Sequence, residues 1–567
     1  MSRRRSSRRS LGTLQRRRVL LLALLGCSGY ALLTARAVQL QALDAEWLAA
    51  RAHSQHRGTL RLGPLRGPIR DRHGSLLAAS ADVESVAVSP RRVRDRARVA
   101  RELARVLGLD ARQLERRLSS RRGFVWIKRW VAPDQADRVR QLALPGVSLH
   151  AERKRFYPSR GLAASYVGFA GRDGQGLTGL ELAFDAVLRG APTSIPFRKD
   201  ARGVKLIDWE GDLGARSGAT LTLTLDARLQ NFAESLLERT LERTRARQAT
   251  LVALDPRNGD LLTLAERPSF NPNRFWIEEA GAFRAHAFTN PFEPGSTLKP
   301  FVVALALEAG VTTPSDRFDC ENGSWRVRDR VIHDFKPHGV LSVRDIVRLS
   351  SNIGAAKVAE RLGSRRLVRG LHRLGFGETS GSGFPGESAG LLRDLRDSQA
   401  VERANLSFGQ GLSVTAVQLA AAGAVLANGG RGVRPRLVLR LEGTSGRIDW
   451  PSGLGERRLS RETARIVREM MREVVASGTG RLAALPHHAV AGKTGTSQKV
   501  INGRYSREHF VASFLGMLPA RRPQLVVVVV VDEPHGSYTG GAVAAPLFRE
   551  FAAFAAEQLA LPRGDAT

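Results

Sequence analysis

Residues 293–300 read EPGSTLKP and hold the single Ser-x-x-Lys of the 567-residue chain. The serine is Ser296 and the lysine is Lys299. Two further motifs follow in order: Ser-Ser-Asn starts 54 residues after Ser296, at position 350, and Lys-Thr-Gly-Thr starts 143 residues later, at position 493. One such motif alone is usually an ordinary turn. All three in this order indicate acyl transfer through an activated serine.

The composition makes the lysines of this chain informative. Of the 88 basic residues only 9 are lysines and 79 are arginines, yet Lys299 and Lys493 both fall inside the three motifs. A serine hydroxyl needs a base to remove its proton at neutral pH, and lysine can lose a proton whereas arginine cannot. The two lysines therefore favour a catalytic interpretation of the motifs.

The formal net charge of +34 raises the question of nucleic-acid binding. The sequence has no zinc-ligand spacing, helix-turn-helix signal or aromatic-basic ribonucleoprotein motif, so we expect no nucleic-acid partner. Eight of these charges lie in residues 1–18 and the other 26 are spread along the chain. That spread suits a protein beside polyanionic envelope polymers and anionic lipid, and an arginine-rich composition without any partner explains it equally well.

Residues 19–35 form an uncharged and mostly apolar run near the N-terminus. The run is just long enough to span a membrane, and the arginines before it place the N-terminus in the cytoplasm. We therefore expect a cytoplasmic basic tail at residues 1–18 and a transmembrane signal anchor at residues 19–40. Two alternatives remain open, a lipoprotein-like box that ends at Cys27 and a loose twin-arginine signal at residues 7–11.

The rest of the chain is expected to hold two domains, at residues 41–218 and 219–567, joined by a basic irregular stretch near 189–218. In the first domain, apolar residues at helical spacing predict a helix that ends near Gly108, and a second short helix-turn-helix portion is expected to run to about Leu144. With only Cys27 and Cys320 in the chain, no internal disulfide framework is expected.

The second domain shows strand signals at both of its ends. Asn258-Gly259 separates two apolar runs and predicts a hairpin, and a second hairpin is expected from residues 510–518 and 525–531. Residues 548–561 predict a closing amphipathic helix. Strands from distant segments with helices between them predict an α+β fold in which an antiparallel sheet packs between helices.

Further motifs make nearly the whole chain resemble the class B penicillin-binding proteins, most closely their division-specific septal type. In the first domain the resemblance rests on Arg66-Gly67, Ile69, Asp71-Arg72 and Gly74, on Tyr157-Pro158, and on residues 176–181. In the second domain it adds Leu254-Asp255-Pro256, residues 268–273, residues 408–412 and Asp532-Glu533-Pro534 to the three motifs. Thr178 departs from the family pattern, which often has glutamate there.

The resemblance implies an elongated pedestal domain at residues 41–218 and a transpeptidase domain at residues 219–567. It implies a serine-type D-Ala-D-Ala transpeptidase that cross-links peptidoglycan stem peptides during septal wall synthesis, that β-lactams inhibit, and that needs no metal or other cofactor. It also implies a single-pass protein of the bacterial inner membrane with a periplasmic catalytic domain. Lipid-linked glycan strands, a membrane glycosyltransferase and other division proteins are the implied partners.

Each motif then has an implied role. Ser296 is the nucleophile at the N-terminal end of a helix, Lys299 is its base, and Lys493 is a second cation that helps to lower the pKa of Lys299. Ser350 relays a proton to the leaving amine. The edge strand at residues 493–496 lines the cleft, and the backbone amides of Ser296 and Thr496 form the oxyanion hole. The residues expected to bind substrate are Asn352, Thr494, Gly495 and Thr496.

Other interpretations remain open. An elongation-type class B transpeptidase, a D,D-carboxypeptidase and a β-lactamase use the same motifs, although the hydrolytic enzymes do not need an anchor and a pedestal. A catalytically idle division scaffold is a further alternative, and the intact motifs speak against it. His333 with Asp334, and the pair His487-His488, are interpreted as ordinary surface or loop residues rather than as metal ligands.

Overall fold

The computed structural model describes residues 8–62, 64–199, 205–206, 217–396, 399–444 and 446–563. The chain divides into two compact units, one of residues 1–64 with 191–216 and the other of residues 65–190 with 217–567. The first seven residues of the expected cytoplasmic tail, which include the start of the twin-arginine-like run, lie outside the described residues. So does much of the expected junction near 189–218. The domain boundaries stay predictions.

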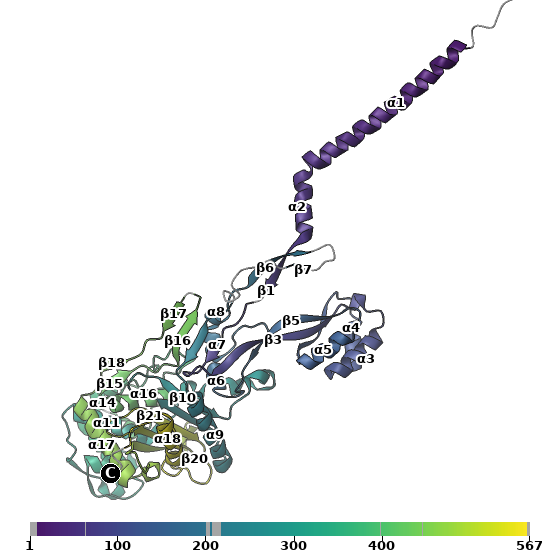
Figure 1. Ribbon diagram of the computed structural model, residues 1–567. Helices are drawn as coiled ribbons and strands as arrows, with labels where there is room; N and C mark the ends of the chain where they lie inside the picture. Colours follow the sequence, from purple (N-terminus) through teal and green to yellow (C-terminus); the bar gives the residue numbers. More distant parts are fainter. Residues whose placement is uncertain are drawn as a thin grey trace, which may run out of the picture. The chain divides into compact units, whose positions relative to one another are not determined.

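The first unit carries the apolar N-terminal helix (Figure 1). Helix α1 spans Arg8–Val38, and the π-helical turn η1 (Gln39–Leu43) continues it. Within the described part of the chain, Gln15–Leu43 is the one helix long and apolar enough to cross a membrane. The expected anchor at residues 19–40 lies inside it. The unit also contains α2 (Ala45–His56) and a sheet of β1 (Arg57–Leu62), β6 (Thr193–Lys199) and β7 (Lys205–Leu206).

The second unit begins with a mixed sheet in the order β17-β16-β8-β2-β3-β4, in which β5 also pairs with β3. The pairing of β2 with β8 is parallel, and it joins the first expected domain to the second. The strands are β2 (Ile69–Arg70), β3 (Leu76–Val88), β4 (Val125–Val131), β5 (Val147–Phe156), β8 (Thr220–Leu223), β16 (Val438–Gly443) and β17 (Gly446–Asp449).

Three helices form a head lobe, residues 89–150, around β4 and the end of β3: α3 (Arg96–Leu107), α4 (Ala111–Leu118) and α5 (Pro133–Gln141). The Asp95 side chain caps α3, and Gly108, in the left-handed region at φ +66°, ends it as predicted. The expected helix-turn-helix portion up to Leu144 is wrong in one respect, because β4 lies between α4 and α5. Its apolar residue Ile127 packs into the core of the lobe.

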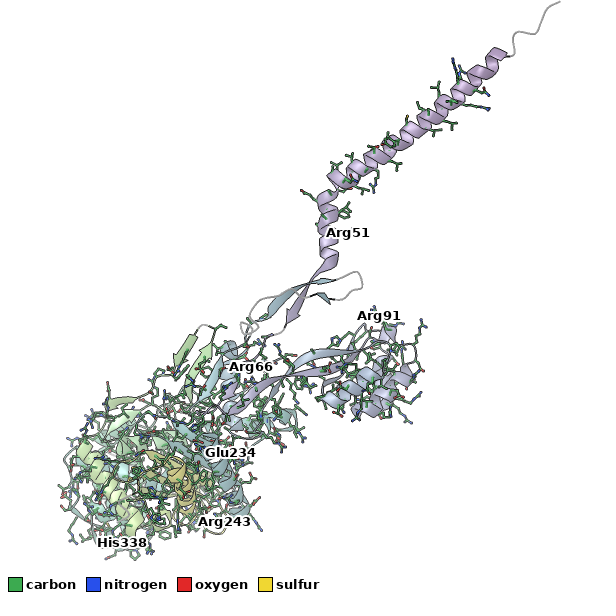
Figure 2. The ribbon with its side chains drawn as sticks, viewed as in Figure 1. Arg51, Arg66, Arg91, Glu234, Arg243 and His338 are labelled. Carbon is green, nitrogen blue, oxygen red and sulfur yellow. The ribbon has the colours of Figure 1, made fainter. Side chains whose placement is uncertain are left out.

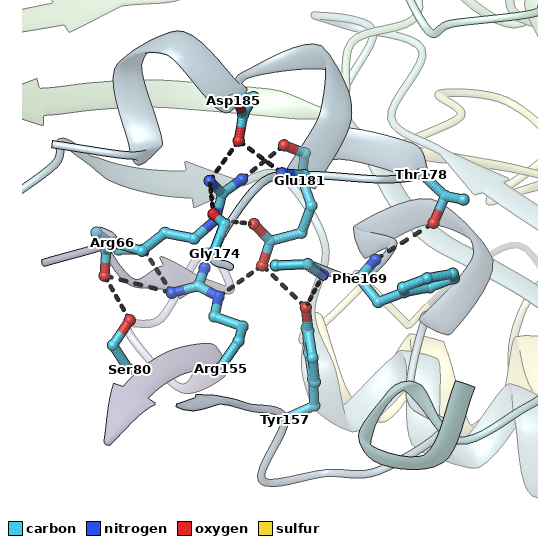
Figure 3. A network of polar contacts seen from close by, with 12 residues as sticks. Arg66, Ser80, Arg155, Tyr157, Phe169, Gly174, Thr178, Glu181 and Asp185 are labelled. Atoms are coloured by element: carbon cyan, nitrogen blue, oxygen red, sulfur yellow. Dashed lines mark hydrogen bonds and ion pairs between the residues drawn. The ribbon is translucent and has the colours of Figure 1, made fainter. Parts of the chain in front are cut away.

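A buried polar network holds the motifs of the first expected domain together (Figure 3). The Glu181 carboxylate accepts from Arg66 Nε at 2.5 Å and from Arg155 Nε at 2.6 Å, and all three side chains are at least nine-tenths buried. Tyr157 donates to the same carboxylate at 3.2 Å, and Arg66 also reaches Asp185. Removing one member of such a network leaves a buried charge unpaired, which typically costs about 3–5 kcal/mol.

The sheet of the second expected domain has five antiparallel strands in the order β10-β9-β21-β20-β19. Helices α9 and α18 cover one face, and α16 packs against the other. This confirms the expected α+β fold, both predicted hairpins, and the edge position of residues 493–496 in β19. These elements are α9 (Ala227–Thr244), β9 (Gln248–Leu254), β10 (Leu261–Arg267), α16 (Ala416–Ala427), β19 (Ala491–Ile501), β20 (Arg504–Leu518), β21 (Leu525–Asp532) and α18 (Ala544–Gln558).

The remaining long helices lie between the two hairpins in the sequence and carry the first two motifs. They are α11 (Lys299–Glu308), α12 (Val343–Leu349), α13 (Asn352–Leu362), α14 (Ser364–Leu374), α15 (Ala400–Ser407) and α17 (Arg461–Ser477).

Candidate active site

Ser296 lies at the N-terminal end of a helix, as predicted. The 3-10 turn η6 (Gly295–Leu298) leads directly into α11. Gly295 takes a φ of +56°, and a Cβ there would lie 2.9 Å from the carbonyl oxygen of Thr496. A side chain at this position would therefore strain the turn and push it away from β19. Among the described residues, none hydrogen-bonds the half-buried Ser296 Oγ, which leaves this hydroxyl open to a substrate.

Lys299 is fully buried and points to the second motif rather than to solvent. Its Nζ donates to the Ser350 carbonyl at 2.5 Å, to the Asn352 Oδ1 at 2.7 Å and to the Ser350 Oγ at 3.2 Å. Burial lowers the pKa of Lys299 from 10.5 to about 7, although the Asp334 carboxylate opposes this shift. A lysine with a pKa near neutrality can accept a proton at physiological pH, as a general base must.

Ser350 lies between the two lysines. It ends α12 in the left-handed conformation, at φ +66°, and its Oγ accepts from Lys493 Nζ at 2.9 Å as well as from Lys299. A non-glycine residue in this conformation is strained by roughly 1–3 kcal/mol, and such strain is often found at functional sites. The hydroxyl is thus held where it can exchange a proton with either amine.

Lys493 is also fully buried, and it differs from Lys299 in its electrostatics. Burial, and then the charge of Lys299, lower the pKa of Lys493 well below its ordinary value. The sequence interpretation had Lys493 as the cation that depresses the pKa of Lys299. Burial is the largest cause of the lowered pKa at both lysines, and the two amines, which share the Ser350 hydroxyl, repel each other when both are charged.

Asp334 is a site residue that the sequence interpretation missed. Its Oδ1 accepts from the backbone amides of Asn352 at 2.5 Å and Ile353 at 3.0 Å, and its Oδ2 accepts from Ser351 Oγ at 2.6 Å. The carboxylate thereby holds the first turn of α13, where a negative charge is favoured. The Asn352 side-chain amide donates to the backbone carbonyl of the neighbouring His333 at 2.9 Å. Asn352 is positioned from both sides by these contacts.

The third motif packs closely against the turn that carries the serine. A Cβ on Gly495 would lie 2.3 Å from Ser513 Oγ and 2.7 Å from the Pro294 carbonyl, so the glycine is required by this internal packing. Its expected role of admitting a substrate backbone stays a prediction. The Thr496 hydroxyl accepts from the Gly540 amide at 3.0 Å, which fixes the orientation of that side chain. The Thr494 hydroxyl is held by a hydrogen bond with the Thr479 hydroxyl, with the two oxygens 2.8 Å apart.

The structure therefore brings all three motifs together. Contacts within 3.5 Å join Lys299, Ser350, Asn352 and Lys493, and the Ser296 turn packs on the strand of Thr496. A hydroxyl nucleophile, two buried amines with lowered pKa values and a second hydroxyl between those amines can remove a proton, carry it and return it. That is the chemistry of acyl transfer through a serine.

Comparisons with known proteins agree with this geometry. Residues 249–553 match the penicillin binding protein transpeptidase domain, and residues 61–223 match the penicillin-binding protein dimerisation domain. The chain is 35% identical to the probable peptidoglycan D,D-transpeptidase PenA of Neisseria gonorrhoeae, over 92% of this chain and 89% of that protein. It is 33% identical to the peptidoglycan D,D-transpeptidase FtsI of Escherichia coli, over 93% of this chain and 89% of that protein.

A solved structure extends the likeness to three dimensions. Penicillin binding protein 3 from Mycobacterium tuberculosis, in a complex with aztreonam, is similar at a TM-score of 0.69 and 27% identity, over 89% of this chain and 99% of that chain. Both family domains, the near full-length relatives and the fold lead to one assignment. The chain belongs to the class B penicillin-binding proteins.

Proposed function

We propose that this protein is a peptidoglycan D,D-transpeptidase that works through an acyl-enzyme on Ser296. The observation that carries the proposal is the Ser350 hydroxyl held between the Lys299 and Lys493 amines, next to the serine turn. Relatives that match nearly the full chain are named peptidoglycan D,D-transpeptidases, which supports the same reaction.

The first half-reaction forms the acyl-enzyme. The Ser296 Oγ attacks the carbonyl carbon between the two D-alanines of a stem peptide, and its proton passes to neutral Lys299. The backbone amides of Ser296 and Thr496 stabilise the oxyanion; one such donor is typically worth about 10² to 10³ in rate. The C–N bond then breaks, a proton returns through Ser350 to the leaving nitrogen, and D-alanine departs.

The second half-reaction transfers the acyl group. An amine of a neighbouring stem peptide attacks the ester carbonyl, loses its proton to the same relay, and displaces Ser296 as a hydroxyl. In this proposal Asn352 holds the peptide amide of the donor. Thr494 and Thr496 bind the terminal carboxylate, and Gly495 lies where the extended stem peptide pairs with β19. No step of this proposed reaction requires a metal or cofactor.

We further propose a septal role in the periplasm, with the N-terminal helix as an uncleaved single-pass anchor in the bacterial inner membrane. The likeness to FtsI supports the division role. The positive-inside rule supports the orientation, because residues 1–18 carry eight arginines and no acidic residue. Lipid-linked glycan strands, a membrane glycosyltransferase and other division proteins are the proposed partners. An elongation role would place a tagged copy along the side wall rather than at midcell.

The experiment that tests the activity uses the full chain in detergent with a fluorescent penicillin. Labelling should appear at about the 61.8 kDa of the chain and disappear in Ser296→Ala. Incubation with uncross-linked glycan strands should then yield cross-linked muropeptides together with released D-alanine. Release of D-alanine without cross-links would identify a carboxypeptidase, and labelling without either product would identify an idle scaffold.

A further inference from the structure

The head lobe carries a concentration of positive charge that the acyl-transfer mechanism does not use. Residues 89–150 contain 16 basic and 6 acidic residues, a net charge of +10, which is about a third of the chain's +34 in about a tenth of its length. Figure 2 labels Arg91 on this lobe, among side chains that point outward from its helices. Such a local excess favours an anionic partner.

Most of this charge has no acidic partner within the described chain. Asp95 and Asp110 are occupied as N-caps of α3 and α4, and their carboxylates accept backbone amides. Nine exposed arginines make no hydrogen bond or ion pair through their guanidinium groups with any described residue: Arg92, Arg94, Arg96, Arg98, Arg101, Arg112, Arg116, Arg121 and Arg122. Unpaired guanidinium groups can each bind a carboxylate in a bidentate manner.

An aromatic cluster lies beside one of these arginines, Arg122. The rings of Phe124, Trp126 and His150 contact one another edge to face, with centroids 4.9–5.4 Å apart. Phe124 is 45% exposed. Phe124 and Trp126 line an open pocket of about 380 Å³ together with Arg122 and Ser120, whose buried Oγ has no hydrogen-bond partner among the described residues. The pocket thus offers apolar ring surface beside positive charge.

We propose that this pocket and the arginines around it bind the uncross-linked peptidoglycan strand, at a site outside the transpeptidase cleft. The strand combines sugar rings, whose C–H faces can cover Phe124 and Trp126, with stem-peptide carboxylates that can pair with Arg121 and Arg122. An anionic lipid surface would use the charge but has no need of a concave aromatic pocket. The inference rests on the proposed function, because a cross-linking enzyme is the one that meets this polymer.

The consequence is that the polymer stays attached to the enzyme between acyl transfers. A second contact raises the effective concentration of the next stem peptide near Ser296, without any change in the cleft itself. Because the contact is largely ionic and exposed, its strength should fall as salt rises.

The test measures binding of fluorescent uncross-linked peptidoglycan strands to the full chain in neutral detergent. The cleft is first blocked by acylating Ser296 with a β-lactam, so that the head lobe alone can respond. The double variant Arg121→Ala/Arg122→Ala should weaken binding at least tenfold, and Phe124→Ala several-fold. Arg243→Ala/Arg365→Ala removes two equally exposed arginines outside the lobe, and it should leave the affinity within twofold.

Fluorescent-penicillin labelling of every variant separates the two proposals. Failure of all proteins to label would defeat the proposed function, whereas normal labelling with unchanged strand affinity in both head-lobe variants would defeat this inference alone. Poly-L-glutamate should compete less well than unlabelled strands at equal carboxylate concentration. Equal competition would mean that the surface binds any polyanion. The strand affinity of the wild type should persist in phosphatidylglycerol nanodiscs. If it fell there to the affinity of the double variant, lipid would be the occupant of the surface. Either result would overturn the proposal.

Discussion

Replacing Glu266 with glutamine should make the protein more stable at neutral pH, although the residue is a buried, hydrogen-bonded carboxylate. Glu266 lies on β10 and is 3% exposed. Its Oε2 accepts from the Tyr166 hydroxyl at 2.7 Å and from the His286 amide at 2.8 Å. Its Oε1 has no partner among the described residues. The adjacent residue Arg267 pairs instead with Glu234 and Glu238.

The size of the effect follows from the pKa. Burial raises the pKa of Glu266 from 4.5 to about 7, and the charge of Glu234 adds to this shift, while the Ser165 and Tyr166 hydroxyls and the His286 amide oppose it. A raised acid pKa means that the folded protein keeps a proton that the unfolded chain loses. The contribution of Glu266 to the free energy of unfolding is therefore greatest below pH 4.5 and is lost as the pH rises toward 7. A shift of that size corresponds to about 3 kcal/mol.

Glutamine removes this loss because it carries no charge at any pH. Its amide oxygen can accept from Tyr166 and His286, and its NH₂ can face Ser165, whose Oγ also lacks a partner among the described residues. At pH 8, Glu266→Gln should therefore unfold at a temperature a few degrees above the wild type, and at pH 5 the two should differ little. Thermal melts of the full chain in neutral detergent at pH 5, 6, 7 and 8 measure this difference.

Glu181→Gln is the matched control. Its carboxylate is equally buried but lies between Arg66 and Arg155, so the variant loses two charge-assisted bonds and should be less stable than the wild type from pH 5 to 8. The reasoning would be refuted if the melting curves of Glu266→Gln and the wild type ran parallel across this range. It would also be refuted if Glu266→Gln were destabilised at pH 8 as strongly as Glu181→Gln.

Three further predictions concern the site and the anchor. The rate of acylation by a chromogenic β-lactam should rise with pH to a plateau above about 7, as Lys299 loses its proton. The acylation rate of Lys299→Arg should be lower by at least roughly 10³-fold, because arginine stays protonated. A flat pH profile of the wild type would exclude Lys299 as the base. Asp334→Asn should slow acylation about tenfold, because Asn352 would be held less firmly. The variant should also lower the midpoint of the pH profile of acylation, because Asp334 raises the pKa of Lys299. An unchanged midpoint would leave Asp334 a purely structural role. Mass spectrometry of the membrane protein should find the sequence before Cys27 intact, and a chain that starts at lipid-modified Cys27 would contradict the uncleaved anchor.

The elements that the sequence predicted well are those whose ends are encoded locally. Gly108 marks the end of α3, and Asn258-Gly259 marks the turn between β9 and β10. The closing helix, expected from Phe548, in fact begins at Ala544. The pattern missed its first turn, which reads Ala544-Ala545-Pro546-Leu547, because alanine and proline give little apolar periodicity.

What the sequence did not reveal depends on partners far along the chain. Strand β4 pairs with β3, about 40 residues earlier, and its valine and tryptophan content was the one local signal for a strand. Asp334 holds the start of α13 from 18 residues away, and nothing around Asp334 in the sequence marks that contact. Glu266 likewise reads as one polar residue in an apolar run. Its raised pKa arises from burial, and the charge of Glu234, on a distant helix, adds to it.

The Ser-Ser-Asn motif shows why a structural and a catalytic interpretation of the same residues need not compete. Read as structure, the motif is a helix cap, and Ser351 is indeed the N-cap of α13, with its Oγ accepting from the Gly354 amide. That cap ends one helix and starts the next within two residues, which forces Ser350 into its left-handed conformation. In that conformation the Ser350 carbonyl and hydroxyl both face Lys299. The cap therefore produces the catalytic geometry, and a substitution that abolished the Ser351 cap should impair acylation although Ser351 contacts neither lysine.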